Sequence, residues 1–233
     1  LSLHDALPIW MCDYPGAWRA DGAYGQYVIV VPQKEMVIVV TQCSSMNGLK
    51  ERNIIWRTLL DKVTDTPIKE GKDYNKLLKK QTEYAFPTVK GKSDSWKASA
   101  INGKTIELSK NKLGWKSIKF SFKKEELTAE ITDVMGKIST IAAGHENWTT
   151  SSLGNYPPYS ITAIGRYKGL TGPFHAASSY GWNNKGSDLT MQIHYVDWIS
   201  ALRINFNFQQ VGKVTMTVKA NYEGKPFTIT GTF

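Results

Sequence analysis

The chain is poor in cysteine and has no long apolar run. Its 233 residues include only two cysteines, Cys12 and Cys43, which are too few for a disulfide framework and lack metal-ligand spacing. They can be free thiols or form a single bridge, and we expect free thiols. No stretch approaches the roughly 20 apolar residues that a bilayer requires, and no N-terminal segment combines a basic start with an apolar core. We therefore expect no membrane span.

Arginine is also scarce. The net charge of +9 comes almost entirely from lysine, because the chain has only five arginines. Base recognition and bidentate phosphate binding favour arginine, and no aromatic stacking signature accompanies a basic stripe. We therefore expect no nucleic-acid partner, and instead a solvated lysine-rich surface that could be attracted to anionic polymers of the cell envelope.

Enough hydrophobic residues are present for a globular chain. At 41% hydrophobic and 12% aromatic residues, the composition excludes disorder and allows one large core or two small ones. The patterns in the first third predict both strands and helices, whereas those in the remainder predict strands alone. We predict a domain at residues 10–65, a linker at 66–94 with a short helix near 74–81, and a β-barrel at 95–233.

The first nine residues, LSLHDALPI, do not fit this organisation. They resemble translated sequencing-adapter sequence, so we expect residues 1–9 to be a non-native leader and exclude them from the fold. The same interpretation predicts that the natural protein extends upstream of Trp10.

Two apolar runs, YVIVV at 27–31 and MVIVVT at 36–41, predict paired strands that are covered on both faces. A polar turn follows them, and residues 49–63 then have the spacing of an amphipathic helix. Its expected apolar stripe consists of Ile55, Leu59 and Val63, with Trp56 and Leu60 beside it. The unit is thus a strand pair with a terminal helix that covers it.

The order of these elements carries a family resemblance. The stretch RADGAYGQYVIVVPQKEMVIVVTQ and the helix after it resemble the C-terminal end of serine β-lactamase-like hydrolases, which include class C β-lactamases, DD-peptidases and esterases. In that family a Ser-x-x-Lys serine is the nucleophile, a tyrosine motif follows, and a Lys-Thr-Gly-type triplet walls the acyl site. The resemblance implies an α+β remnant of such a domain, with the Ser-x-x-Lys and tyrosine motifs upstream.

The resemblance places the triplet at Ala20-Asp21-Gly22. It implies that the N–H of Ala23 is one half of an oxyanion hole and that an acyl substrate, a small molecule or a peptide, approaches there. Small residues suit this position because a side chain would block the approach. The triplet lacks the lysine and threonine of the motif, and Asp21 can either contact substrate or make a turn hydrogen bond.

Two strings elsewhere match Ser-x-x-Lys, at 109–112 and 121–124. The first is expected in a turn and the second at the end of a strand, whereas the family's serine begins a helix. A lysine-rich chain produces such strings by chance, so we assign no catalysis to Ser109 or Ser121.

Strict alternation dominates from Ser95 onward and predicts half-buried antiparallel strands in a closed meander or sandwich. A two-residue hairpin turn is expected at Asn102-Gly103, and further turns at Asn111–Gly114 and Asn183–Gly186. The expected inward faces are Ile118, Phe120 and Phe122; Leu127, Ala129 and Ile131; Leu189, Met191, Ile193 and Tyr195; Ile204, Phe206 and Phe208; and Val214, Met216 and Val218. The succession of these strands resembles the C-terminal barrel of Bacteroidetes-type serine hydrolases, which implies an all-β, lipocalin-like antiparallel barrel.

The barrel sequence suggests no chemistry of its own. The spacing of His145, His175 and His194 does not place two ligands on one strand face, so we expect no metal and no cofactor. Three tryptophans can be core and girdle residues or can line a mouth for a sugar or peptide; they are Trp148, Trp182 and Trp198. The loop at 155–159 is expected to be exposed and can lean toward the missing catalytic domain.

Three functions therefore remain. The first is the C-terminal part of a serine hydrolase, which the resemblance places in the periplasm or cell envelope. The others are a barrel that binds glycans or muropeptides and a purely structural accessory domain. The sequence leaves the oligomeric state open.

Overall fold

The computed structural model describes the chain except for residues 1–8, 23, 43–47, 68, 159–170 and 199. Contacts between residues divide the chain into two units, Leu1–Phe86 and Pro87–Phe233, and each unit is described separately. Among the helices of the described residues, none is long and apolar enough to cross a membrane.

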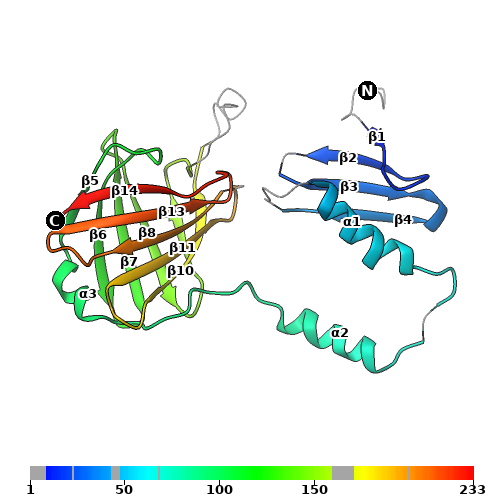
Figure 1. Ribbon diagram of the computed structural model, residues 1–233, viewed down its shortest axis with the longest axis horizontal. Coiled ribbons are helices and arrows are strands. Elements are labelled where there is room, and N and C mark those ends of the chain that lie inside the picture. Colours follow the sequence, from blue (N-terminus) through cyan, green and yellow to red (C-terminus); the bar gives the residue numbers. More distant parts are fainter. Residues whose placement is uncertain (1–8, 23, 43–47, 68, 159–170, 199) are drawn as a thin grey trace. The chain divides into compact units, whose positions relative to one another are not determined.

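The first unit contains a four-stranded antiparallel sheet in the order β1-β2-β3-β4 (Figure 1). Its strands are β1 (Ile9–Met11), β2 (Trp18–Gly22), β3 (Gln26–Val31) and β4 (Met36–Val40), with a 3-10 turn η1 (Pro32–Lys34) between the last two. The helices are α1 (Gly48–Thr58), the 3-10 turn η2 (Leu60–Lys62) and α2 (Lys72–Glu83). The predicted linker helix is therefore present as α2, and it is longer than expected.

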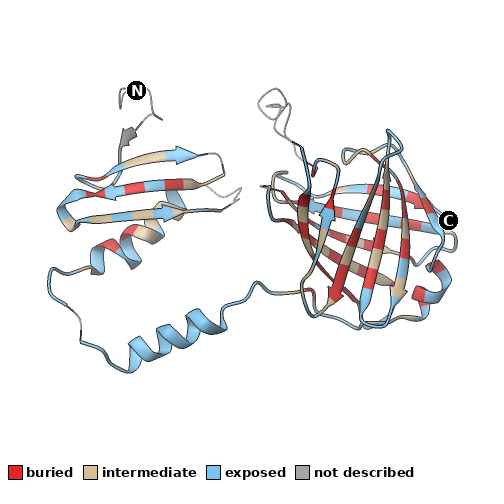
Figure 2. Ribbon diagram, turned by 180° about the vertical axis from the view of Figure 1, so that it is seen from behind, coloured by how far each residue is buried: buried red, intermediate tan, exposed pale blue. Residues whose placement is uncertain are grey.

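One face of this sheet holds the core of the unit. Tyr27, Ile29 and Val31 alternate along β3 with at most 5% of their surface exposed, and they form one cluster with Trp56 and Leu60. The opposite face is different, because its valines are exposed among the described residues (Figure 2). These are Val28 and Val30 on β3 and Val37 and Val39 on β4.

The prediction of a single helix over residues 49–63 was wrong in its extent and its stripe. The α-helix ends at Thr58, and the chain continues through Leu59 into the 3-10 turn η2. This break disturbs the four-residue spacing, so Leu59 is 42% exposed, whereas Trp56 and Leu60 are the buried residues. Trp56 and Leu60, which were expected beside the apolar stripe, are therefore at its centre.

The second unit is a closed β-barrel. Nine strands follow each other in the order β11-β12-β13-β14-β5-β6-β7-β8-β10, and pairing of β10 with β11 closes the ring. β9 pairs with β10, and the contact between β8 and β10 is parallel, whereas the other pairs are antiparallel. The elements are α3 (Trp96–Ile101), β5 (Thr105–Leu108), β6 (Trp115–Lys123), β7 (Glu126–Asp133), β8 (Ile138–His145), β9 (Thr149–Leu153), β10 (Phe174–Trp182), β11 (Asp188–Tyr195), β12 (Ala201–Asn207), β13 (Lys213–Ala220) and β14 (Phe227–Thr232).

The alternation predicted for the barrel is confirmed. Residues on the five expected inward faces are buried, except that Phe122 is half-buried against the core. The hairpin predicted at Asn102-Gly103 was wrong: this turn follows the short helix α3 rather than a strand, so it joins a helix to β5. The turns near Gly114 and Gly186 do join neighbouring strands, and both glycines have positive φ.

Residues just before α3 also belong to the barrel. Val89 is 1% exposed, and its N–H donates to Ser179 Oγ on β10 at 3.0 Å. Lys92 pairs with Trp182 through both backbone hydrogen bonds, each 2.9 Å. This segment therefore lies beside the end of β10 that does not pair with β9.

Candidate functional site

The predicted site lies at the end of β2, where the strand turns into β3. Gly22, the last residue of β2, is paired with Gln26. A Cβ atom on Gly22 would lie 3.0 Å from Cβ of Gln26, which is tighter than ordinary van der Waals contact. The hairpin itself therefore needs a small residue here.

The turn after Gly22 has a left-handed backbone. Tyr24 has φ 62° and Gly25 has φ 80°, a conformation that glycine adopts without strain. A Cβ on Gly25 would also lie 2.6 Å from a carboxylate oxygen of Glu51. Ala23, the expected oxyanion donor, lies outside the described residues.

Asp21 makes an ion pair along its own strand. Its Oδ1 accepts a hydrogen bond from Arg19 Nε at 2.8 Å, because residues two apart on a strand share one face. The hydrogen bond to Asp21 raises the pKa of Arg19. Among the described residues, the carboxylate is therefore held by a side chain two residues before it.

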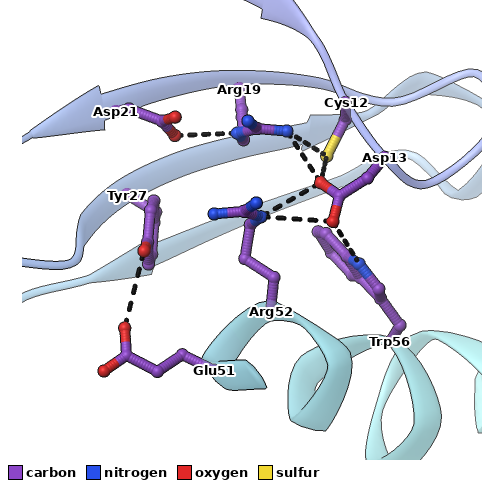
Figure 3. Close-up of polar contacts among 8 residues, drawn as sticks. All are labelled: Cys12, Asp13, Arg19, Asp21, Tyr27, Glu51, Arg52 and Trp56. Carbon is purple, nitrogen blue, oxygen red and sulfur yellow. Dashed lines mark hydrogen bonds and ion pairs between the residues drawn. The ribbon is translucent and has the colours of Figure 1, made fainter. Parts of the chain in front are cut away.

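Asp13 lies at the centre of the polar cluster in Figure 3. Its carboxylate accepts hydrogen bonds from Arg19 Nη1 at 2.7 Å, from Arg52 Nε at 3.0 and 3.3 Å, and from Trp56 Nε1 at 3.4 Å. Burial alone would raise the pKa of Asp13, but hydrogen bonds and the charge of Arg52 outweigh it, so the pKa is lowered. Asp13 thus joins β2 to α1.

A second group of contacts joins the first turn of α1 to the β2–β3 turn. Gln42 Nε2 donates to Glu51 Oε2 at 2.8 Å and to the carbonyl of Gly25 at 2.7 Å. The Tyr27 hydroxyl donates to the same Glu51 oxygen at 3.5 Å (Figure 3), and burial raises the pKa of Tyr27. The guanidinium of Arg52 lies 5.6 Å from the centre of the Tyr27 ring.

These contacts leave the ion-paired groups of the site without a net charge. Asp13 and Asp21 balance Arg19 and Arg52, so these four charges sum to zero, and each group is engaged by another. Cys12 Sγ contacts Asp13 and Arg19 at 3.5 and 3.8 Å. The arrangement positions the end of β2 against α1, and Asp13 and Asp21 are held in ion pairs.

The sequence did not predict the roles of Asp13 and Arg52. They are 39 residues apart, and neither belongs to a motif. The four-residue spacing of Arg52 and Trp56, which places both on one helix face, was the only available signal. It does not reveal which carboxylate that face meets.

In the barrel, the two Ser-x-x-Lys strings lie where the sequence predicted. Ser109 is in the turn between β5 and β6, and its Oγ accepts from the N–H of Thr230 at 3.3 Å. Ser121 lies near the end of β6, and Lys124, after that strand, has φ 53°. Neither serine begins a helix.

The barrel histidines contact different groups. His145 Nε2 is 3.0 Å from the Gly91 carbonyl, His175 Nδ1 is 2.5 Å from Asp197 Oδ2, and His194 packs edge-on against Trp148. Among the described residues, no group of three His, Cys, Asp or Glu side chains could hold a metal ion.

Of the three tryptophans considered for a mouth, Trp182 is fully buried in the core. Trp198 packs against Phe174, with ring centres 5.5 Å apart, and Trp148 lies on the outside against His194. In the loop at 155–159, Tyr159 lies outside the described residues, and Asn155 Nδ2 donates to Ser139 Oγ at 2.9 Å.

Comparison with known proteins does not extend this description. No family model matches the chain, and no curated protein has a similar sequence.

Proposed function

We propose that residues 10–65 are the C-terminal end of a serine β-lactamase-like hydrolase domain, which cleaves an amide, ester or lactam through an acyl-serine. One observation carries the proposal: in the part of the first unit that the structure describes, the sheet is covered by α1 on one face only. The other face presents valines, of which Val37 and Val39 are 61% and 64% exposed. Adjacent strands with an exposed apolar face are typical of a sheet that packs against further structure.

The location of the triplet at 20–22 in the fold supports the same proposal. The triplet at 20–22 ends a strand beside a glycine-bearing turn, where backbone can approach a substrate closely. The outer edge of β4 has no strand partner among the described residues, so it can pair with another strand of the domain. Both features favour a hydrolase end over an isolated sheet.

We assign the roles in the site from the resemblance. The N–H of Ala23 donates to the developing oxyanion, and the N–H of the serine nucleophile supplies the second donor. Asp21 and Gly22 wall the acyl site as the third motif. Asp21 is paired with Arg19, so we assign it to lining the site and positioning this strand. We assign proton transfer to side chains of the Ser-x-x-Lys and tyrosine motifs.

We further propose that the barrel is a non-catalytic accessory domain, lipocalin-like in its closed meander. Its interior holds large side chains, including Phe120, Tyr180, Trp182 and Phe206, which favours a structural part over a wide ligand cup. The substrate is a small molecule or peptide with an acyl group. The resemblance also leads us to propose a periplasmic or cell-envelope location.

The test is acylation of the natural gene product by a fluorophosphonate or penicillin probe, mapped by mass spectrometry. We expect one serine upstream of Trp10 to be labelled in a Ser-x-x-Lys motif. The 233-residue chain should remain unlabelled, because an oxyanion donor without a nucleophile has no reaction to stabilise. Labelling of Ser109 or Ser121, or of no serine in the longer product, would contradict the proposal.

A matched pair of glycine variants tests the third motif. Gly22→Val should slow acylation of the longer product by about 100- to 1000-fold, the range for loss of an oxyanion-hole donor, because the added atoms displace the end of β2. Gly71→Val is the control, since a Cβ there meets nothing within 4 Å. Equal acylation rates in the two variants would exclude this strand from the site.

A further inference from the structure

Helix α2 (Lys72–Glu83) carries apolar side chains that are not covered. No residue of α2 is buried, and Figure 2 shows the whole helix as exposed. Tyr74, Leu77 and Leu78 are 42%, 53% and 41% exposed. Because they are spaced i, i+3 and i+4, these three side chains lie on one face of the helix. Apolar side chains that gather on one exposed face mark a surface that a partner can cover.

The length of α2 also favours a partner. The helix has 12 residues, and an isolated helix of this length is marginal in water, since most helices in proteins are stabilised by packing of their apolar face. No side chain caps its N-terminus with a hydrogen bond. A surface that buries the apolar face of α2 would therefore also stabilise the helix.

The opposite face of α2 is rich in lysine. Four lysines are spaced i, i+4, i+7 and i+8, which centres them on the side opposite the apolar face; they are Lys72, Lys76, Lys79 and Lys80. Asp73 and Glu83 lie 2.9 and 3.7 Å from two of these lysines, and all four side chains are at least 65% exposed, so both ion pairs are weak. Four lysines and two acids leave the helix with a net charge of +2.

Two aromatic side chains follow the helix. Tyr84 is 74% exposed and Phe86 is 63% exposed, and their ring centres lie 6.0 Å apart. Aromatic rings are favoured where apolar and aqueous surroundings meet, as at the headgroup level of a membrane. The exposed apolar surface of this segment therefore continues beyond the C-terminus of α2.

Three kinds of partner differ in which side chains they would contact. A nucleic acid or another acidic polymer would bind the lysines and leave the leucines in water. An apolar groove in a protein takes anchors at i, i+3, i+4 and i+7, but the residue seven positions after Tyr74 is Gln81. An anionic lipid surface takes up the apolar face and attracts the lysines to its headgroups. It is thus the partner that contacts both faces of α2.

We propose that α2, together with Tyr84 and Phe86, is a peripheral anchor that binds the surface of an anionic membrane. Its apolar face lies between the headgroups and the acyl chains, and its lysines lie in water near the phosphates. The helix lies along the surface, because 12 residues reach only about 18 Å, whereas the hydrocarbon core is about 30 Å thick. These side chains lie outside the triplet at 20–22, so the anchor does not depend on the proposed hydrolase activity.

The test is flotation of the 233-residue chain with lipid vesicles. We expect the chain to bind vesicles of phosphatidylcholine with about 30% phosphatidylglycerol, and to bind phosphatidylcholine alone at least about tenfold more weakly. Raising NaCl from about 0.02 M to about 0.5 M should remove most of this difference, because salt screens exposed charges. Equal binding to the two kinds of vesicle, or no binding at low salt, would overturn the proposal.

Leu77→Gln combined with Leu78→Gln is the decisive variant. It should weaken binding to the anionic vesicles at least about tenfold, since two apolar side chains no longer enter the lipid. Both leucines are exposed, so the melting temperature should stay the same. The matched control is Val134→Gln combined with Met135→Gln, at positions 68% and 81% exposed between β7 and β8. Equal weakening in the two variants would exclude α2 as the anchor, and a lower melting temperature in the leucine variant would show that the chain itself covers α2.

Lys76→Gln combined with Lys80→Gln tests the contribution of charge. It should weaken binding about 10- to 30-fold at low salt and much less at high salt, because each lysine near an anionic surface contributes separately. Lys213→Gln combined with Lys219→Gln removes the same charge from exposed positions of β13 and should weaken binding less than about threefold. The same loss in both variants would mean that the chain binds through its overall charge, which would contradict an anchor at α2.

Discussion

The two units bury their apolar residues in different ways. Among the described residues, the barrel has one core cluster of 29 buried hydrophobic residues, whereas the first unit has a cluster of six. The barrel closes on itself, so every inward side chain meets another. The first unit has an open sheet, and its described residues cover only one of the two faces.

The difference shows how much each unit depends on polar contacts. In the barrel, aromatic pairs such as Phe120 and Phe206, with ring centres 5.1 Å apart, pack the interior. In the first unit, α1 is tied to the sheet by Asp13 and Arg52 as well as by Trp56. Charge neutralisation should therefore affect the first unit far more than the barrel.

The largest effect is expected for Phe206→Ala in the barrel. Phe206 is 1% exposed, so truncation loses its contacts and leaves a cavity, and the free energy of unfolding should fall by about 3–5 kcal/mol. Urea unfolding followed by tryptophan fluorescence measures it. Phe86→Ala, at a position 63% exposed, should change stability by less than about 0.5 kcal/mol. Equal losses would show that the barrel core is not the main source of stability.

Asp13→Asn should have the next largest effect, and it should be confined to the first unit. It removes the charge that balances Arg52 and part of Arg19, which should cost about 1–3 kcal/mol. Hydrogen exchange of amides in β2 and α1 reports it separately from the barrel. Asp65→Asn, at an exposed position, should change nothing.

The same variant makes a prediction about pH. The pKa of Asp13 is lowered in the folded state, so its contribution is present above the unfolded pKa of about 3.9 and is lost as pH falls through the folded value. Amides of β2 and α1 should lose protection over that range, and Asp13→Asn should lose less. An identical acid response in the two proteins would contradict the role of Asp13.

His194→Ala should have a smaller effect on the barrel. The side chain is half-buried on the outer face, edge-on to Trp148 with ring centres 5.1 Å apart, so its loss should cost about 0.5–1.5 kcal/mol. Burial lowers the pKa of His194, so its contribution is present above about pH 6.5 and declines as pH falls toward the folded value. Barrel melting temperatures at about pH 7.5 and 5.5 should therefore differ more in the unmodified chain than in the variant.

The smallest effect is expected for Val39→Thr on the exposed sheet face. Val39 is 64% exposed, so stability should change by less than about 0.5 kcal/mol. Ile29→Thr on the covered face of the same sheet, where exposure is 0%, should cost about 1–3 kcal/mol, because it buries a hydroxyl and loses apolar contact. If Val39→Thr costs as much as Ile29→Thr, the valine face is covered in this chain and the contrast between the units disappears.

Local pattern was enough to predict most of the barrel. Alternation identified the inward faces of β6, β7, β11, β12 and β13, because a strand with one buried face repeats every two residues whatever it pairs with. The helix α3 was missed because six residues, WKASAI, are too few for a helical period to stand out. As a result, the end of helix α3 at Asn102 was predicted to be a hairpin turn between strands.

The candidate site was predicted less well. Small residues at the triplet were predicted to allow close approach, and the structure adds that a Cβ on Gly22 would crowd Gln26 and that Gly25 has φ 80°. Asp21 was recognised, but its partner Arg19 was not. Asp13 could not be found at all, because its partners come from β2 and α1.

The sequence by itself determined which residues face inward in the barrel, where most turns lie, and which segment resembles the acyl site of a hydrolase. Such features depend on neighbours within a few positions of the chain. Only the tertiary structure decided that β10 meets β11 to close the ring, that Asp13 joins Arg19 to Arg52, and that Tyr195 and Trp115 line one cavity. The residues brought together in this way are about 6 to 80 positions apart in the sequence. Which of them meet depends on how whole strands and helices pack, and the local spacing of apolar residues does not contain this information.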